Sequence, residues 1–146
     1  MKMIRDASGF VGQWVADRSK SAIEDGAMSF GFVNDDGRLV AGVTVTRRDG
    51  NTCMITVAAT DPHWCHPTHL ASMFGTVYDE LGVDLIYVLC ATSNRRSNRL
   101  ALGLGFQADG RLRGIGPNGD DLNLYGMLRE DCKFLQEAPA KVSING

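Results

Sequence analysis

The sequence predicts a single α+β domain built around a mixed sheet. Three observations support this prediction. The first half alternates apolar and polar residues between short Gly-containing turns, the middle carries a helical apolar stripe followed by an almost wholly apolar run, and the end reads as a hairpin. The 146 residues, 44% of them hydrophobic, suit one core. We assign residues 1–135 to the domain and 136–146 to a flexible tail, which contains little periodicity.

The expected elements follow in chain order. An apolar helical face after Ser8, the expected N-cap, predicts a helix that runs to about Glu24. Gly-containing turns then separate three strands of an antiparallel meander, and a helix, a strand, a further helix and a closing hairpin follow. The expected ranges are 29–33, 39–46 and 52–59 for the meander, 68–81, 85–90 and 94–104 for the next three elements, and 106–113 and 121–129 for the hairpin.

The middle of the chain sets the topology. A strand, a helix and a second strand in succession form a crossover, and such crossovers are right-handed. We therefore expect strands 52–59 and 85–90 to lie parallel inside the mixed sheet. The run 85–90 is apolar at nearly every position, which is typical of a strand covered on both faces.

Charge and hydropathy exclude several function classes. A net charge of -2 and a pI near 5.9 argue against nucleic-acid binding by bulk electrostatics. No apolar run reaches the roughly 18 residues of a membrane span, and the N-terminal residues do not read as a signal peptide. We therefore expect a cytoplasmic protein. The 4 cysteines form no CxxC pair, and in a reducing compartment we expect all of them to be thiols.

A family resemblance is carried by residues 94–113 and 121–127. Asn94-Arg-Arg-Ser-Asn98, followed by Leu-Gly-Phe at 104–106 and Asp-Gly-Arg-Leu-Arg at 109–113, resembles the N-x-x-S-N…L-G-F…E-G-x-L-R signature of the GCN5-related N-acetyltransferases (GNAT). Asp-Leu-Asn-Leu-Tyr125 resembles the D-x-N-x-Y pattern of the branch that acetylates ribosomal-protein N-termini. With the strand order, the resemblance covers roughly residues 27–132. Asp109 replaces the usual glutamate.

The resemblance implies an acetyl-CoA site between two splayed parallel strands, here 52–59 and 85–90. Backbone groups near Val57, Ala58 and Ala59 would bond the pantetheine amides. The pyrophosphate would lie at the start of the next helix, near Thr68 and His69, where unpaired N–H groups favour an anion. From the opposite side, the resemblance implies cofactor contacts from Asn94 and Asn98.

Three departures from the family pattern stand out. The motif [QR]-x-x-G-x-[GA] before the phosphate-binding helix is missing, so the Thr68 hydroxyl and the helix amides would serve alone. The position of the family's frequent catalytic tyrosine holds Ala101, so the resemblance to the ribosomal-protein branch assigns the acid role to Ser97. The N-terminal part is short, so we expect the family's first strand and one early helix to be absent, which leaves an open acceptor groove.

Direct acetyl transfer needs a base for the amine and a proton donor for the leaving thiolate. Asp61 and His63 are the base candidates, and Ser97 and Tyr125 are the acid candidates. Each residue also has a purely structural interpretation. Asp61 would open a turn, Ser97 would bond backbone in a first helical turn, and Tyr125 would pack its ring in a strand.

Two other hypotheses compete with the enzyme. The first is a catalytically silent relative that binds a protein or ligand, supported by the missing glycine motif and by Ala101. The second is a zinc-stabilised interaction module, since residues 63–69 read H-x-C-H-x-x-H. That spacing matches no established zinc pattern, so we expect no metal. The sequence leaves the acceptor amine open, and also whether the chain forms a homodimer.

Overall fold

A computed structural model describes residues 1–6, 9–21 and 26–137. In this part of the chain, seven strands form one mixed sheet in the order β1-β2-β3-β4-β5-β7-β6. The strands are β1 (Lys2–Arg5), β2 (Met28–Val33), β3 (Leu39–Asp49), β4 (Thr52–Ala59), β5 (Leu85–Ala91), β6 (Gln107–Leu112) and β7 (Leu122–Leu128). The helices are α1 (Phe10–Ser19), α2 (Pro67–Gly75), α3 (Arg95–Leu104) and α4 (Lys133–Glu137). Shorter turns are η1 (Pro62–Cys65), η2 (Thr76–Glu80, a π-helical continuation of α2), η3 (Pro117–Gly119) and η4 (Arg129–Asp131).

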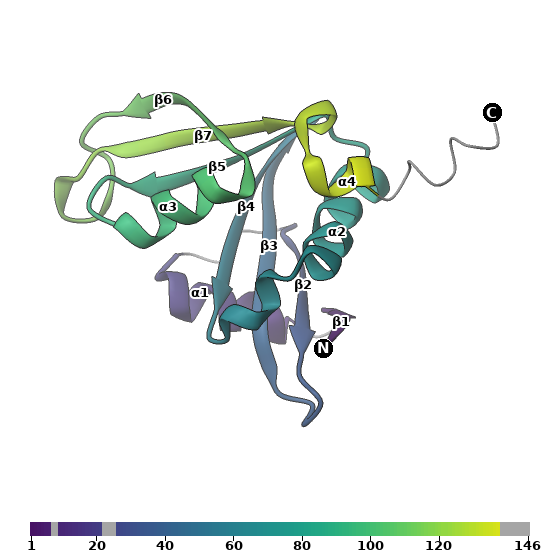
Figure 1. Cartoon of the computed structure of the whole chain (residues 1–146). Helices are drawn as coiled ribbons and strands as arrows, with labels where there is room; N and C mark the ends of the chain where they lie inside the picture. The colour runs from purple at the N-terminus through teal and green to yellow at the C-terminus, as the bar shows by residue number, and fades with distance from the viewer. Residues whose placement is uncertain (7–8, 22–25, 138–146) are drawn as a thin grey trace, which may run out of the picture.

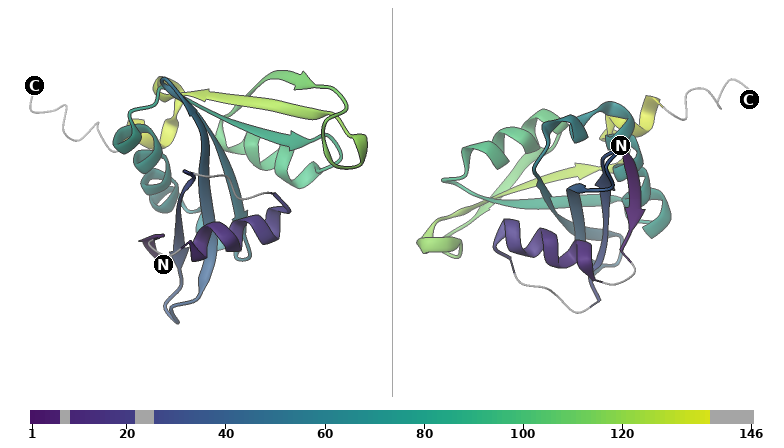
Figure 2. Two further views of the ribbon diagram at one scale, coloured as in Figure 1. Left: turned by 180° about the vertical axis from the view of Figure 1, so that it is seen from behind. Right: turned by 90° about the horizontal axis from the view of Figure 1, so that it is seen from below.

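Helices cover the two faces of the sheet. α1 lies across β2, β3 and β4 on one face, whereas α2 and α3 lie on the other (Figures 1 and 2). At Gly31 a Cβ atom would lie 2.6 Å from Leu39 of β3. At Gly42 a Cβ atom would lie 2.6 Å from Val15 of α1, so the close approach of α1 depends on Gly42. Val11 and Val15 of α1 occupy this space, and each is 1% exposed.

The main core lies between the sheet and α2. Phe30 and Phe74 are fully buried there, and the ring of Phe74 stacks on Phe134 of α4 with centroids 5.6 Å apart. The buried Tyr78 of η2 donates its hydroxyl to the Met127 carbonyl of β7 at 2.6 Å. These contacts join the two halves of the sheet through α2 and η2.

The predicted fold class is confirmed. β2, β3 and β4 form the antiparallel meander, and β4 pairs in parallel with β5 across α2 and η2. β7 pairs antiparallel with both β5 and β6, which is the expected closing hairpin. Gly82 ends the helical segment with φ 69°, and Gly105 ends α3 with φ 104°, as their positions predicted.

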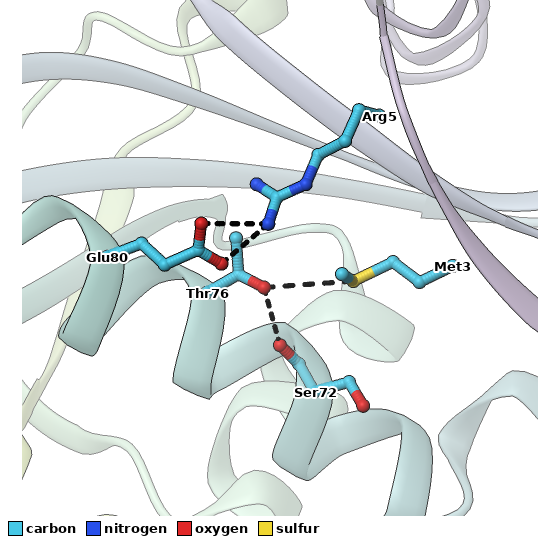
Figure 3. A network of polar contacts seen from close by, with 5 residues as sticks. All are labelled: Met3, Arg5, Ser72, Thr76 and Glu80. Carbon is cyan, nitrogen blue, oxygen red and sulfur yellow. Dashed lines mark hydrogen bonds and ion pairs between the residues drawn. The ribbon is translucent and has the colours of Figure 1, made fainter.

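A short first strand is present, so the expectation that it would be absent is wrong. β1 pairs antiparallel with β2 along its whole length. Figure 3 shows how it is held: Arg5 donates to both carboxylate oxygens of Glu80 at 2.8 and 2.6 Å, and the Thr76 hydroxyl lies 3.7 Å from the sulfur of Met3. The partners come from η2, far along the chain, and four residues show too little periodicity to reveal a strand.

Three element boundaries also differ from the sequence prediction. α1 ends at Ser19, with Lys20 in the left-handed region at φ 56°, well before the expected end at Glu24. Residues 7–8 and 22–25, and with them Ser8, lie outside the described residues, and the N-cap of α1 is Gly9 rather than the predicted Ser8. β3 continues through the predicted turn to Asp49, because a bulge with Arg47 at φ 50° lets the strand resume pairing. The predicted tail begins inside α4, and residues 138–146 of it lie outside the described part.

None of the described helices is long and apolar enough to cross a membrane.

Candidate functional site

β4 and β5 run side by side only at their first residues. They pair from Thr52 opposite Leu85 to Met54 opposite Tyr87, and no pairing between the two strands follows. Figure 1 shows the strands close together at one end and diverging toward the other. The predicted splayed parallel strands are therefore confirmed, and the opening has the form that an extended ligand needs to bond both strand edges.

The β4 edge of the opening carries free backbone groups. The Thr60 N–H donates to the Val40 carbonyl at 2.8 Å, which marks one hydrogen-bonded pair of the β3–β4 ladder. Such pairs alternate along an antiparallel ladder, so Ala58 is bonded to β3 as well. The N–H and C=O groups of Val57 and Ala59 point the other way, into the opening. Of the three residues expected to bond a ligand through backbone, two present free groups and Ala58 does not.

The β5 edge is partly occupied by the chain itself. The Thr92 N–H donates to the Asp121 carbonyl at 3.0 Å, so by the same alternation the backbone groups of Leu89 and Ala91 face β4. The Ala91 carbonyl accepts the side-chain amide of Asn98 at 2.9 Å. The N–H and C=O of Leu89 have no partner among the described residues. The open edge on this side is therefore centred on Leu89.

A polar network lies beside the carboxyl end of β5, with Asn98 of α3 at its centre. Its Oδ1 atom accepts the Tyr125 hydroxyl at 2.6 Å and the Asn123 side-chain amide at 2.8 Å. Its own amide donates to the carbonyls of Ala91 and Asn94 at 2.9 and 2.7 Å. Tyr125 is 5% exposed, whereas Asn98 and Asn123 are half-buried, so the network is shielded from water on the Tyr125 side. It holds α3, β5 and β7 in fixed relation at the opening.

Asn94 and Ser97 form the first turn of α3. The Asn94 Oδ1 atom accepts the Ser97 N–H at 3.1 Å, so Asn94 is the N-cap of the helix. The Ser97 side chain is half-buried, and its hydroxyl has no hydrogen-bond partner among the described residues. Ser97 is therefore an available hydroxyl donor, whereas the hydroxyl hydrogen of Tyr125 is already directed at Asn98.

Asp61 and His63 form a hydrogen-bonded pair just beyond β4. Asp61 is the N-cap of η1, and its Oδ1 atom accepts from the His63 N–H at 2.9 Å and lies 2.8 Å from His63 Nδ1. These two hydrogen bonds lower the pKa of the Asp61 carboxyl. The His63 side chain is 88% exposed. An ionised Asp61 thus orients the imidazole and leaves its Nε2 atom facing solvent.

The start of α2 offers fewer free amides than expected. Pro67 has no N–H, and the Thr68 N–H donates to His66 Nδ1 at 3.2 Å, which makes His66 the N-cap. The Thr68 hydroxyl is exposed. The His69 ring lies 5.6 Å from the ring of Phe32 on β2, two strands away from β4 in the sheet, so its side chain lies over the meander. An anion at this helix start would meet the Thr68 hydroxyl and the His69 N–H.

Among the histidines of residues 63–69, the rings of His66 and His69 lie 5.7 Å apart, and each histidine also has a further contact. His63 pairs with Asp61, His66 caps Thr68 and His69 packs near Phe32. In the described part of the chain, no three His, Cys, Asp or Glu side chains lie together as a metal-binding group. The described residues therefore offer no set of ligands that would support the zinc-module hypothesis.

The 4 cysteines are free thiols that lie buried or half-buried. Burial raises the pKa of Cys53 to about 11, and it also raises the pKa of Cys65, Cys90 and Cys132. Such thiols are protonated at neutral pH and are poor nucleophiles. Nothing in their placement suggests a covalent acyl-cysteine intermediate.

Two residues of the site had no assigned role in the sequence analysis. Asn123 is a direct partner of Asn98, and His66 caps α2. The spacing of Asn123 and Tyr125 contained a usable signal, because residues two apart on a strand share a face. No comparable signal marked His66, whose ring could equally have pointed into solvent.

Comparison with known proteins gives a clear result for the fold. No family model and no curated protein matches the sequence. Among solved structures, the spermidine/spermine N-acetyltransferase SpeG from Vibrio cholerae aligns over 94% of this chain and 98% of its own, with TM-score 0.73 and 15% identity. An acetyltransferase of the GNAT family from Bacillus anthracis aligns over 70% of this chain and 66% of its own, with TM-score 0.59 and 18% identity.

The chain has the GNAT fold. The ribosomal-protein-S5-alanine acetyltransferase from Vibrio fischeri is a further neighbour, with TM-score 0.60 and 14% identity. The alignment covers 73% of this chain and 64% of that enzyme. Both the ribosomal-protein branch expected from the motifs and a small-amine enzyme are thus structural neighbours.

Proposed function

We propose that the chain is an N-acetyltransferase that transfers the acetyl group of acetyl-CoA to a primary amine. The observation that carries this proposal is the opening between β4 and β5 in a GNAT fold, with unpaired backbone groups on Val57, Ala59 and Leu89. The pantetheine arm of acetyl-CoA contains amides that pair with such groups as an added strand does. Asn94 and Asn98 stand at the mouth of the same opening, where α3 begins.

The transfer forms a C–N bond and breaks the thioester C–S bond, and the amine loses a proton while the sulfur gains one. Ser97 suits the sulfur side, because its hydroxyl is uncommitted. Tyr125 is the alternative donor, but its hydroxyl hydrogen is already donated to Asn98 Oδ1. Asp61 orients His63, so His63 Nε2 is the base, acting directly or through a water molecule. The Ala59 N–H is the candidate donor to the oxyanion.

The phosphates would lie at the start of α2, on the Thr68 hydroxyl and the His69 N–H. The Thr68 N–H could also bind the phosphates if the His66 ring moved away. At present this N–H donates to His66 Nδ1, so the imidazole and the phosphates compete for one donor. This competition also supports a second candidate function, a catalytically silent GNAT-fold protein that binds a ligand or a protein. The four cysteines form no disulfide, which is compatible with the cytoplasm as the place of action.

The proposal is tested by measuring the free thiol of coenzyme A that is released from acetyl-CoA in the presence of an acceptor amine. The acceptors would be a peptide with a free N-terminus, a lysine-containing peptide with a blocked N-terminus, and spermidine. The enzyme hypothesis expects turnover above background with at least one of them, and stabilisation of the chain by acetyl-CoA in a thermal shift. Stabilisation without turnover would favour the silent binding protein. If acetyl-CoA gives neither turnover nor stabilisation, both the enzyme and a silent protein that binds acetyl-CoA are contradicted.

A further inference from the structure

The last turn of α1 carries an arginine that is held in place without a carboxylate partner. The Arg18 guanidinium carbon lies 3.9 Å from the centre of the Trp14 ring, and one guanidinium N–H donates to the Trp14 carbonyl at 3.4 Å. Arg18 is exposed, and no carboxylate of the described residues forms an ion pair with it. Because a guanidinium carries five N–H donors, most of the donors of Arg18 are available.

The environment of Arg18 prepares it for an anion. A guanidinium over an aromatic ring is attracted to that ring, which restricts its side chain. Its planar fork matches the two oxygens of a carboxylate. The neighbouring carboxylate, Asp17, is directed elsewhere, because it accepts the side-chain amide of Gln13 at 2.7 Å. Within the described part of the chain, Arg18 is therefore a fixed cation that lacks an anion.

The course of α1 places this cation over β4. Gly12 lies above β2, since a Cβ atom there would come within 3.2 Å of the Ser29 hydroxyl, whereas Trp14 lies 3.4 Å from the corresponding position at Gly42 of β3. A helix rises about 1.5 Å per residue and strands lie about 4.8 Å apart, so Arg18 is about one strand further along. Figure 2 shows the same course, with the end of α1 toward the side of the sheet where β5 lies.

At β4, the end of α1 meets the segment that borders the opening. The side chain of Ala58 packs in the cluster that contains Trp14 and the valines of α1. Val57 and Ala59, on either side of Ala58, face the opening with their backbone groups. In the proposed function the phosphates of the cofactor lie at the start of α2, on the opposite face of the sheet from α1. The face of α1 is therefore the side from which an acceptor amine can approach the acetyl group beside Ala59.

We infer that Arg18, positioned by Trp14, binds a carboxylate of the acceptor, and that the acceptor is an amine whose molecule carries this carboxylate close to the amino group. The inference rests on the proposed function and adds the substrate class to it. A carboxylate would complete the free guanidinium fork with charge-assisted hydrogen bonds. A polyamine, in contrast, would bring its remaining positive charges toward Arg18, and such like-charge contacts select against a ligand.

The test compares two pairs of acceptors in the thiol-release assay. One pair is a peptide with a free N-terminus, an amidated C-terminus and glutamate as its second residue, and the same peptide with glutamine there. The other pair is alanine and alaninamide. The pairs distinguish a side-chain carboxylate from an α-carboxylate as the group that is bound. We expect the acidic member of at least one pair to have a kcat/KM at least about tenfold above that of its neutral partner.

Three variants assign this preference to the guanidinium. Arg18→Gln should reduce it to about threefold or less, and Arg18→Lys should give an intermediate value, because lysine keeps the charge but not the planar fork. A cation in the last turn also complements the helix dipole, but that role needs only the charge and involves no acceptor. Arg48→Gln is the matched control: it removes one exposed arginine from β3 near Thr52, where β4 is paired with β5, and should keep the full preference. Melting curves show that each variant folds.

The outcomes separate this inference from the proposed function. Equal kcat/KM within both pairs, a preference that survives Arg18→Gln, or one that Arg48→Gln abolishes equally would overturn the role of Arg18 and leave the acetyltransferase standing. Turnover of spermidine without turnover of either acidic acceptor would do the same. No turnover with any amine would overturn the proposed function and this inference together.

Discussion

The Tyr125 hydroxyl of β7 donates to the Oδ1 atom of Asn98 on α3 at 2.6 Å. The same oxygen accepts the Asn123 amide, and the Asn98 amide donates to the Ala91 carbonyl at the end of β5. One side chain thus forms hydrogen bonds with polar groups of three elements at the place where the sheet opens. Leaving a buried polar group without its partner costs about 1–3 kcal/mol, so this residue stabilises the geometry of the opening.

The first prediction concerns this network. Asn98→Leu would leave the Tyr125 hydroxyl and the Asn123 side-chain amide without their partner, whereas the Ala91 carbonyl would keep the Asn94 N–H. The substitution should lower the free energy of unfolding by about 2–3 kcal/mol. Tyr125→Phe removes one donor while Asn98 keeps Asn123, and should cost about 0.5–1.5 kcal/mol. Urea unfolding of the two variants measures the difference. Equal losses would show that Asn98 is not the centre of the network.

The second prediction separates the two acid candidates. Ser97→Ala should lower kcat by about 10²-fold or more, the range for loss of general acid catalysis, and leave the Kd of acetyl-CoA within a few-fold. Tyr125→Phe should retain most of the turnover, because its hydroxyl hydrogen serves Asn98 rather than the opening. Steady-state kinetics with calorimetry distinguishes them. A fully active Ser97→Ala beside an inactive Tyr125→Phe would reverse the two roles.

The third prediction uses proline to remove single backbone donors from β4. Ala59→Pro deletes an N–H that faces the opening, so the fold should persist while acetyl-CoA affinity and turnover fall. Ala58→Pro deletes an N–H that is bonded to β3 and leaves its β3 acceptor without a partner, so it should destabilise the sheet by about 1–3 kcal/mol. Thermal melting and calorimetric titration of both variants provide the measurement. Normal acetyl-CoA binding by Ala59→Pro would remove the β4 edge from the site.

The fourth prediction concerns the phosphates. A hydrogen bond to a charged group is worth roughly 1.5–3 kcal/mol, so Thr68→Ala should weaken coenzyme A binding about tenfold or more. Thr68→Ser keeps the hydroxyl and should bind nearly normally. Thr68→Glu should be weaker than alanine, because a negative charge repels the phosphates. Calorimetry on the three variants decides the matter, and equal affinities would place the pyrophosphate away from α2.

The fifth prediction is a pH dependence. The His63 hydrogen bonds lower the pKa of Asp61 below its ordinary value of 3.8 in the folded chain. A lowered folded pKa stabilises the protein above the unfolded pKa, and this stability is lost as pH falls through the folded value. The melting temperature should therefore decline more on acidification below pH 3.8 for the wild type than for Asp61→Asn. Parallel curves for the two proteins would contradict the lowered pKa.

Much of the fold was predictable, because long elements show their own periodicity. The bounds expected for β4 match the structure, and Gly82 and Gly105 end helices where predicted. Each element that the sequence analysis missed or misplaced has a specific structural cause. β1 depends on Arg5 reaching Glu80, a contact from far along the chain. α1 stops early where the Ser19 hydroxyl bonds back to the Val15 carbonyl, a bond that competes with helix continuation.

The candidate site was less predictable than the fold. The opening between β4 and β5 followed from the resemblance, and the structure reproduces it. The free backbone groups are known only once it is known whether Ala58, or instead its two neighbours, is hydrogen-bonded to β3. The sequence does not contain this information. The occupation of the Thr68 N–H by His66 depends on a single rotamer, which is likewise invisible in the sequence.

The most direct test of the central claim is amide hydrogen exchange of β4, resolved by NMR, with and without acetyl-CoA. If the pantetheine arm lies in the opening, the Val57 and Ala59 amides gain protection on addition of acetyl-CoA. The Ala58 amide, already bonded to β3, keeps the protection that it had. Unchanged exchange at Val57 and Ala59 under saturating acetyl-CoA would contradict the account.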